Sequence, residues 1–118
     1  MAHSITCPER NLNDIVKIKS AIESIAIKNG AMFALLFGSY ARGTATRHSD
    51  VDVIFVEETS DPFIKRLGRY MDPLVDELHL AAEVFVYTPR EFSAIKDGFF
   101  VKKALDEGVI VYELGKNG

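Results

Sequence analysis

The chain has 118 residues, of which 47% are hydrophobic and 26% charged, and this composition suits one globular domain, residues 1–118, with a single core. Its formal net charge of −3 argues against a dedicated nucleic-acid-binding protein, and its single cysteine excludes an intrachain disulfide. The start of the chain does not resemble a signal peptide and no apolar run has the length of a membrane span, so we expect a cytoplasmic protein with no membrane partner.

The first elements are an amphipathic helix and a buried strand. Apolar residues recur every three or four positions from Asn11 to Lys28, which predicts a helix that ends at Asn29-Gly30. Either Thr6, in a sequence that resembles a capping box, or Asn11 is expected to cap it. Residues 31–37 are short and continuously apolar, which is typical of a buried strand.

A turn and a polar loop separate this strand from the next one. Gly38-Ser39 is expected to lead into one helical turn that Gly43 closes, and residues 51–58 are predicted as the second strand. Asp61-Pro62 then opens a helix that extends to about Glu77, and Pro73 is predicted to break or restart it.

The rest of the chain alternates strands and helices. Residues 80–88 are predicted as a third strand, and Thr88-Pro89 starts a helix with Thr88 as its N-cap. A last helix, 99–108, precedes a final strand, 109–114. The alternation predicts an α+β fold, with a small mixed sheet of about four or five strands and helices packed mainly on one face.

Two carboxylates at the mouth of the second strand form the first candidate site. Alternate residues of a strand point to the same side, so Asp50 and Asp52 aim together while Val51 and Val53 face the core. Such a pair repels itself unless a cation lies between its members, and Mg²⁺ uses carboxylates and substrate phosphates. Glu83, an acid inside an apolar strand, is the candidate third ligand, or else it forms an ion pair at a sheet edge. Three carboxylates would hold two metal ions about 4 Å apart for displacement at phosphorus.

The Gly-Ser turn is a candidate phosphate site. Glycine at position 38 permits close approach of the backbone to a ligand, and the N–H groups of the turn and the hydroxyl of Ser39 can bind an anion. Arg42 and Arg47 are either further phosphate ligands or surface ion-pair residues. The combination predicts a site for a nucleoside triphosphate with its metal.

The stretch "FGSYARGTATRHSDVDVIFV" resembles the GSx10DxD signature of the polymerase-β-type nucleotidyltransferase superfamily, and the chain is similar to its smallest members, the minimal nucleotidyltransferases (MNT). The segment from Glu83 to Phe92 resembles the strand that carries the third carboxylate in this family. The resemblance implies a palm-like fold in which Gly38 and Ser39 hold the triphosphate of ATP and Asp50 and Asp52 bind Mg²⁺. Glu83 stands where many members have aspartate, at the position that activates the acceptor hydroxyl.

The resemblance also implies a partner. Minimal members pair with a helical HEPN toxin and act as its antitoxin by transferring AMP to one of its tyrosines. Since no separate acceptor-binding domain is visible, we expect either such a partner or a homo-oligomer. The alternatives are an inactive MNT module that neutralises a partner by binding and a small-molecule, antibiotic-type nucleotidyltransferase. Phe99, Phe100 and Val101 could form a partner surface, although we expect most of them to pack in the core.

Overall fold

The computed structural model describes residues 7–115 of the chain, and side chains from Asp14 onward. Its elements, in chain order, are α1 (Cys7–Asn29), β1 (Phe33–Phe37), α2 (Ser39–Arg42), β2 (Val51–Val56), α3 (Phe63–Leu78), β3 (Ala82–Tyr87), α4 (Pro89–Ile95), α5 (Phe99–Glu107) and β4 (Val109–Glu113). None of the helices within residues 7–115 combines the length and apolar character that crossing a membrane requires.

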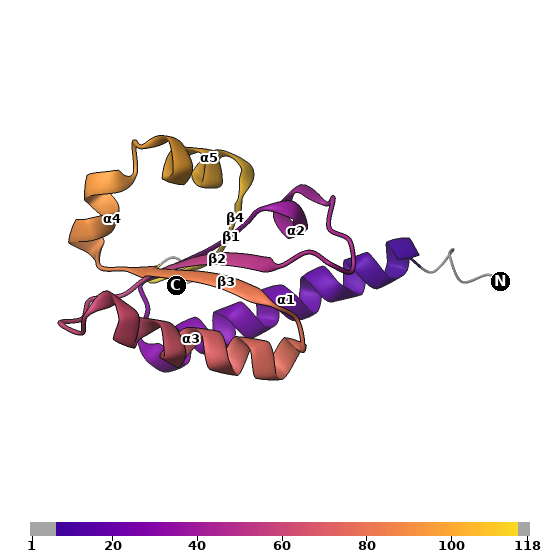
Figure 1. Ribbon diagram of the computed structural model, residues 1–118, viewed down its shortest axis with the longest axis horizontal. Helices are drawn as coiled ribbons and strands as arrows, with labels where there is room; N and C mark the ends of the chain where they lie inside the picture. The colour runs from indigo at the N-terminus through magenta and orange to yellow at the C-terminus, as the bar shows by residue number, and fades with distance from the viewer. Residues whose placement is uncertain (1–6, 116–118) are drawn as a thin grey trace.

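The four strands form one mixed sheet in the order β3-β2-β1-β4 (Figure 1). Strand β1 pairs antiparallel with both β2 and β4, whereas β2 and β3 run parallel. The α+β fold and the mixed sheet confirm the sequence prediction. Strand β2 lies in the interior of the sheet, so its side chains alternate between two covered faces.

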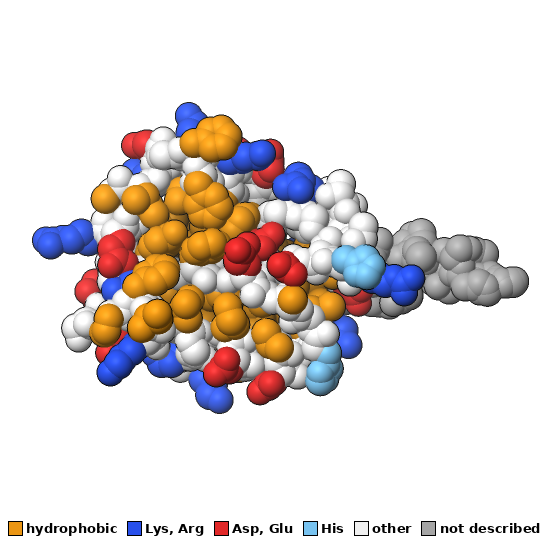
Figure 2. Space-filling view, viewed as in Figure 1, with side chains coloured by type: hydrophobic (Ala, Val, Ile, Leu, Met, Phe, Trp, Pro, Cys, Tyr) orange, Lys and Arg blue, Asp and Glu red, His pale blue; other side chains and the backbone are white. Residues whose placement is uncertain are grey.

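The two faces of the sheet are covered unequally. The long helices α1 and α3 lie on one face, as predicted, and the short helices α4 and α5 lie over the other (Figure 1). The larger core lies under the long helices, and the opposite face has a smaller core around Leu35, Ile54 and Ala104. Hydrophobic side chains gather across the middle of the molecule, with acidic side chains beside them (Figure 2). The less covered face is therefore where a ligand can reach the sheet.

Helix α1 begins earlier than the sequence pattern indicates. It starts at Cys7, so Asn11 lies inside the helix and is not its cap, and that prediction is wrong. The other predicted cap, Thr6, lies outside the described residues. A pattern of apolar residues marks only the part of a helix that packs on the core, and helix ends extend past it.

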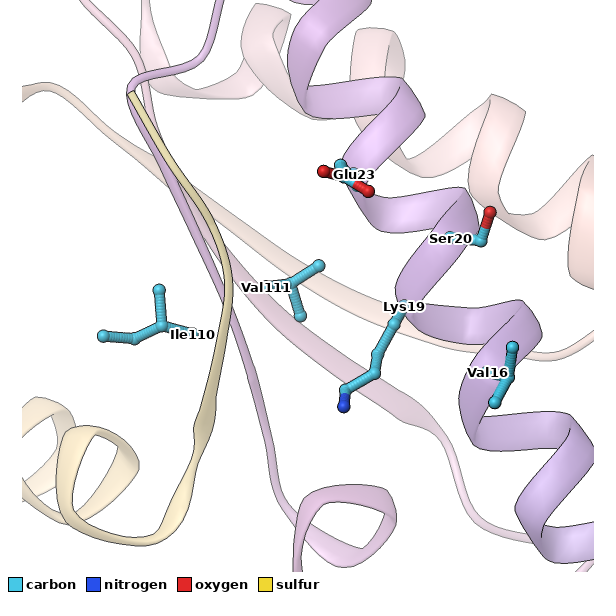
Figure 3. Close-up of a pocket in the computed structure, with 6 residues that line it drawn as sticks. All are labelled: Val16, Lys19, Ser20, Glu23, Ile110 and Val111. Carbon is cyan, nitrogen blue, oxygen red and sulfur yellow. The ribbon is translucent and has the colours of Figure 1, made fainter. Parts of the chain in front are cut away.

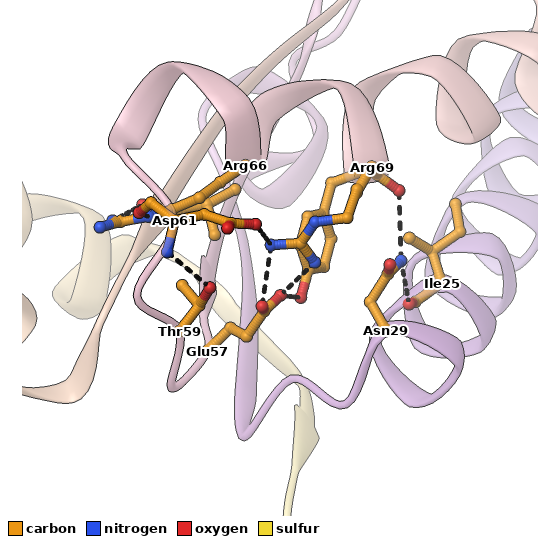
Figure 4. Close-up of polar contacts among 9 residues, drawn as sticks. Ile25, Asn29, Glu57, Thr59, Asp61, Arg66 and Arg69 are labelled. Carbon is orange, nitrogen blue, oxygen red and sulfur yellow. Dashed lines mark hydrogen bonds and ion pairs between the residues drawn. The ribbon is translucent and has the colours of Figure 1, made fainter.

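Helix α3 is continuous through Pro73, so the predicted break is wrong. A proline inside a helix leaves the carbonyl four residues earlier without its usual donor, and here that carbonyl belongs to Arg69. The side chain of Asn29, at the end of α1, donates a hydrogen bond of 3.2 Å to the Arg69 carbonyl (Figure 4). The packing of α1 against α3 thus supplies the donor that the proline removes.

Candidate nucleotide and metal site

The Gly-Ser turn has the predicted form and lies against Asp52. Gly38 has φ 76° and ψ −157°, immediately before α2, and Gly43 closes the turn in the left-handed region. A Cβ placed on Gly38 would overlap the carboxylate of Asp52 and lie 3.1 Å from its Cγ. Glycine is therefore needed at this position both for the backbone angle and for the approach to the carboxylate.

The strand register brings the predicted carboxylates together. Asp52 of β2 lies opposite Glu83 of the parallel neighbour β3, and on the other side it lies opposite Phe37, which precedes the turn. Val51 and Val53 are fully buried on the other face, as predicted. Asp52 is half-buried, while Asp50 and Glu83 are exposed. The acids therefore lie together on the face of the sheet that α5 partly covers.

The acidic surroundings shift the titration of Asp52. Burial, followed by the charges of Glu83 and Asp50, raises the pKa of Asp52 from 3.8 to about 6, and the more weakly acting Arg42 opposes this. The close approach of the Glu83 carboxyl group therefore contributes to the upward shift of the Asp52 pKa in addition to burial. A carboxyl group whose pKa is raised by burial and by neighbouring acids is a candidate for a functional site.

These side chains suit a hard divalent cation. Among the side chains from Asp14 to Gly115, no three His, Cys, Asp or Glu residues already surround a single metal position. Asp52 and Glu83 nevertheless adjoin, Asp50 is close enough to affect the Asp52 pKa, and all three offer only oxygen atoms. Mg²⁺ takes one or two carboxylates and completes its shell with water and phosphate oxygens, so this donor set fits it.

The two predicted arginines lie in different places. Arg42, on α2, lines a pocket together with Gly38, Ser39 and Asp52. Its Nη1 also lies 3.4 Å from Glu107 Oε1 in an exposed ion pair, so both interpretations of this residue apply. Arg47 is exposed in the loop before β2 and is not among the residues that line the pocket. The structure thus brings Arg42, but not Arg47, to the pocket.

This pocket has a volume of about 450 Å³ and lies between the Gly-Ser turn and α5. Helix α5 contributes residues that sequence reasoning did not assign to the site: Phe99, Phe100, Lys103, Ala104 and Glu107. Phe99 and Phe100 are exposed and only Val101 is buried, which corrects the expectation that most of these three pack in the core. The adjacent aromatic residues at the start of a helix were the signal, but nothing in the sequence placed that helix over the Gly-Ser turn.

A second pocket, between α1 and β4, does not have these features (Figure 3). Its volume is about 360 Å³, and Lys19, Ser20 and Glu23 of α1 supply its polar lining. Figure 3 shows Val111 pointing toward α1 and Ile110 pointing away from it. One charge of each sign and no glycine turn make this pocket a poorer site for a metal-bound phosphate than the pocket beside Asp52.

A separate polar network at the other end of β2 was not predicted (Figure 4). Arg69 donates two hydrogen bonds to the Glu57 carboxylate, at 2.8 and 2.9 Å, and the buried Tyr70 hydroxyl also donates to it. Burial and the bond to Glu57 raise the pKa of Tyr70 well above its usual value. Nearby, the buried Arg66 pairs with Glu91 at 2.7 Å. This network ties α3 to the sheet.

The fold and the candidate site can be compared with those of known proteins. The profile of the nucleotidyltransferase domain family matches residues 13–111, which is most of the chain. The chain therefore belongs to this family of transferases, and the predicted membership is confirmed. No curated protein matches the sequence closely enough to add to the assignment.

Solved structures confirm the fold. A toxin-antitoxin with AMP-PNP has a TM-score of 0.63 and 18% sequence identity, over 84% of this chain and 76% of that chain. A mutant of the toxin-antitoxin MntA-HpeT gives the same values. A putative nucleotidyltransferase from Sulfolobus solfataricus has a TM-score of 0.61 and 19% identity, over 92% of this chain and 87% of that chain. At these identities the likeness establishes a shared architecture.

Proposed function

We propose that this protein is a Mg²⁺-dependent nucleotidyltransferase that transfers a nucleoside monophosphate, AMP from ATP in the first instance, to a hydroxyl of a partner protein. The observation that carries the proposal is the Asp52–Glu83 carboxylate pair beside the Gly38-Ser39 turn, with the pKa of Asp52 raised to about 6. Arg42 opposes the charge of these acids only weakly, and the Mg²⁺ of a metal-bound triphosphate would balance it further.

Each side chain of the site has a role in this reaction. The Gly38-Ser39 turn and the Ser39 hydroxyl hold the triphosphate, and Arg42 at the rim of the pocket offsets phosphate charge. Asp50, Asp52 and Glu83 would hold Mg²⁺, which when bound neutralises charge at the reacting phosphate and activates the acceptor oxygen. Glu83 is exposed on an edge strand, where an acceptor can approach it.

The transfer exchanges one P–O bond for another and moves one proton. The acceptor oxygen attacks the α-phosphorus, the bond between the α-phosphorus and the bridging oxygen breaks, and pyrophosphate leaves. A carboxylate oxygen of Glu83 takes the proton of the acceptor hydroxyl, since Glu83 is the most accessible acid of the Asp52–Glu83 pair. The product is an ester between the acceptor oxygen and the monophosphate.

The proposed acceptor is a tyrosine of a HEPN-type toxin, which would make this protein an antitoxin. Two solved structures of the same fold are described as toxin-antitoxin proteins, one of them with AMP-PNP, and this supports both the nucleotide and the kind of partner. The family resemblance of the Gly-Ser and Asp-x-Asp motifs supports the same partner. A homo-oligomer that supplies its own acceptor is the competing arrangement.

Labelled transfer tests the proposal. The full chain is incubated with α-labelled ATP and Mg²⁺, with and without the protein product of the neighbouring gene, and the intact mass of both proteins is then measured. We expect a gain of one or more AMP units on the partner. Asp52→Asn and Asp50→Asn should each reduce the rate about 10²-fold or more. Asp76→Asn, an exposed acid on α3, is the matched control and should transfer normally.

Other outcomes would contradict the proposal. A tight complex without transfer would indicate a module that neutralises its partner by binding alone. Transfer to an aminoglycoside hydroxyl but not to the protein would indicate the antibiotic-type enzyme. Circular dichroism of each variant shows that a loss of transfer is not a loss of fold.

A further inference from the structure

Two adjacent aromatic residues on α5 are exposed beside the candidate site. Phe99, the first residue of α5, is 84% exposed and Phe100 is 45% exposed. Single exposed apolar side chains are ordinary, but these two line the same pocket as Gly38, Ser39 and Asp52. The two rings therefore form an exposed apolar surface next to the Gly-Ser turn.

Phe99 and Phe100 form an aromatic wall of the pocket, and the packing of Phe100 fixes its position relative to the Gly-Ser turn. The ring of Phe100 lies 5.6 Å from that of Phe37, at 84°, and 5.4 Å from that of Phe85, at 65°. Phe37 directly precedes Gly38 in the chain. Phe99, in contrast, pairs with no other aromatic ring of the described residues. One ring is thus anchored beside the turn, and its neighbour has a free face.

A cation follows the aromatic pair on the same side of α5. Lys103 lies four residues after Phe99 and three after Phe100, so it is a neighbour of each on the helix surface, and all three line the pocket. Lys103 is exposed and forms no ion pair with any residue of the described part of the chain. Glu107, one turn further, is already paired with Arg42. The free positive charge on this wall is therefore Lys103.

We propose that α5 forms the nucleoside side of the binding site: the base of the nucleoside triphosphate stacks on Phe99 and Phe100, and the ammonium group of Lys103 pairs with the phosphates. The aromatic side chains offer an apolar surface for the base, and the neighbouring Lys103 offers a positive charge for the phosphates. A pocket of about 450 Å³ is within the usual range for ligands of this size. Stacking requires no particular hydrogen-bonding edge on the base. This inference rests on the proposed function and assigns the base contact within that site.

Isothermal titration calorimetry with two ligands tests whether α5 binds the base. The full chain is titrated, in Mg²⁺, with a non-hydrolysable ATP analogue and separately with tripolyphosphate, which has the phosphates but no base. Phe99→Ala should weaken binding of the ATP analogue about tenfold, the usual size of one stacking contact, and leave tripolyphosphate binding unchanged. Lys103→Gln should weaken binding of both ligands by about threefold or more.

Matched controls are present in the chain. Phe63→Ala removes another exposed aromatic from the first position of a helix, since Phe63 begins α3 and lies against Tyr87 rather than in the pocket. Lys102→Gln removes the adjacent exposed cation, which does not line the pocket. Neither should change binding of either ligand. Phe100→Leu keeps the apolar packing while removing the ring, and should weaken only the ATP analogue.

The failures are distinguishable. If the wild-type chain binds neither ligand, the proposed function and this inference fail together. If it binds both ligands and Phe99→Ala binds the ATP analogue as the wild type does, the site is a nucleotide site but α5 does not hold the base. That result, together with weaker binding of the partner protein by Phe99→Ala, would assign Phe99 to a protein interface and overturn the inference.

Discussion

The two ends of strand β2 each carry an acid that is at least partly buried, and the two acids have opposite surroundings. Glu57, just after the strand, is 6% exposed and accepts hydrogen bonds from Arg69 and Tyr70. Asp52, near the start of the strand, is half-buried against Glu83 and Asp50, and among the side chains from Asp14 to Gly115 only Arg42 acts on it with the opposite sign. One carboxylate is balanced from within the protein and the other is not.

The difference separates a structural acid from a functional one. A shielded carboxylate with a bidentate arginine has its charge and its hydrogen-bonding atoms satisfied, so its removal damages the fold. A carboxylate among other acids costs the fold free energy, and an external cation relieves that cost when it binds. Burial alone would rank Glu57 above Asp52 as a site residue, whereas the partners of each carboxylate reverse the order.

The paired end should give the larger change in stability. Glu57→Ala leaves the Tyr70 hydroxyl buried without its acceptor, and leaves Arg69 with only its longer ion pair to Asp61, at 3.6 Å. We expect the free energy of unfolding to fall by about 3 kcal/mol. Urea unfolding followed by circular dichroism measures this.

Glu58, the next residue, provides the control for this substitution. It is exposed, and Glu58→Ala should change the free energy of unfolding by less than about 0.5 kcal/mol. Equal effects of the two substitutions would contradict the structural role assigned to the Glu57 network.

Removing the charge of Asp52, at the unpaired end, should raise the free energy of unfolding rather than lower it. The pKa of folded Asp52 is about 6, above its usual 3.8, so the folded chain binds the proton more tightly than the unfolded chain. Stability from this group is therefore present at low pH and is lost as the pH rises through about 6. Without divalent cations, Asp52→Asn should be more stable than wild type by about 2 kcal/mol at pH 8, and the gap should close toward pH 4.

Mg²⁺ provides the control for that comparison. A cation that binds the folded wild type should raise its free energy of unfolding at pH 8 and narrow the gap to Asp52→Asn. Urea midpoints at pH 4, 6 and 8, with and without Mg²⁺, give the whole comparison. A less stable Asp52→Asn protein at pH 8 would mean that Asp52 is held by favourable contacts, as Glu57 is.

The sequence predicted the unpaired end better than the paired one, because the unpaired end is local. Gly38, Ser39, Asp50 and Asp52 lie within fifteen consecutive residues, and the alternation of a strand is enough to put both aspartates on one side. The predicted Thr88 cap is equally local, and in the structure Glu91 completes a capping box with it. Glu83 required only the expectation that it lay in a strand.

What the sequence could not predict depends on contacts between distant elements. The Glu57 network needs α3 to pack over the end of β2, and the wall of the pocket needs α5 to lie over the Gly-Ser turn. The course of α3 through Pro73 depends on Asn29, forty residues from the carbonyl that it satisfies. The low helix propensity of proline predicts a break at Pro73, but packing of α1 against α3 keeps the helix continuous.

The smallest expected change in stability tests whether Asn29 supplies the hydrogen bond that Pro73 cannot. Asn29→Ala should cost about 1 kcal/mol of stability, because the Arg69 carbonyl loses its donor while Pro73 still supplies none. In a Pro73→Ala background the N–H of residue 73 can bond to that carbonyl, so Asn29→Ala should cost about 0.5 kcal/mol less there. Some cost should persist, since Asn29 also donates to the Ile25 carbonyl at 3.0 Å.

Thr88→Ala, at a separate helix cap, is the control, and its effect on stability should add to that of Pro73→Ala without coupling. Simple additivity of Asn29→Ala and Pro73→Ala would mean that the asparagine does not replace the missing donor.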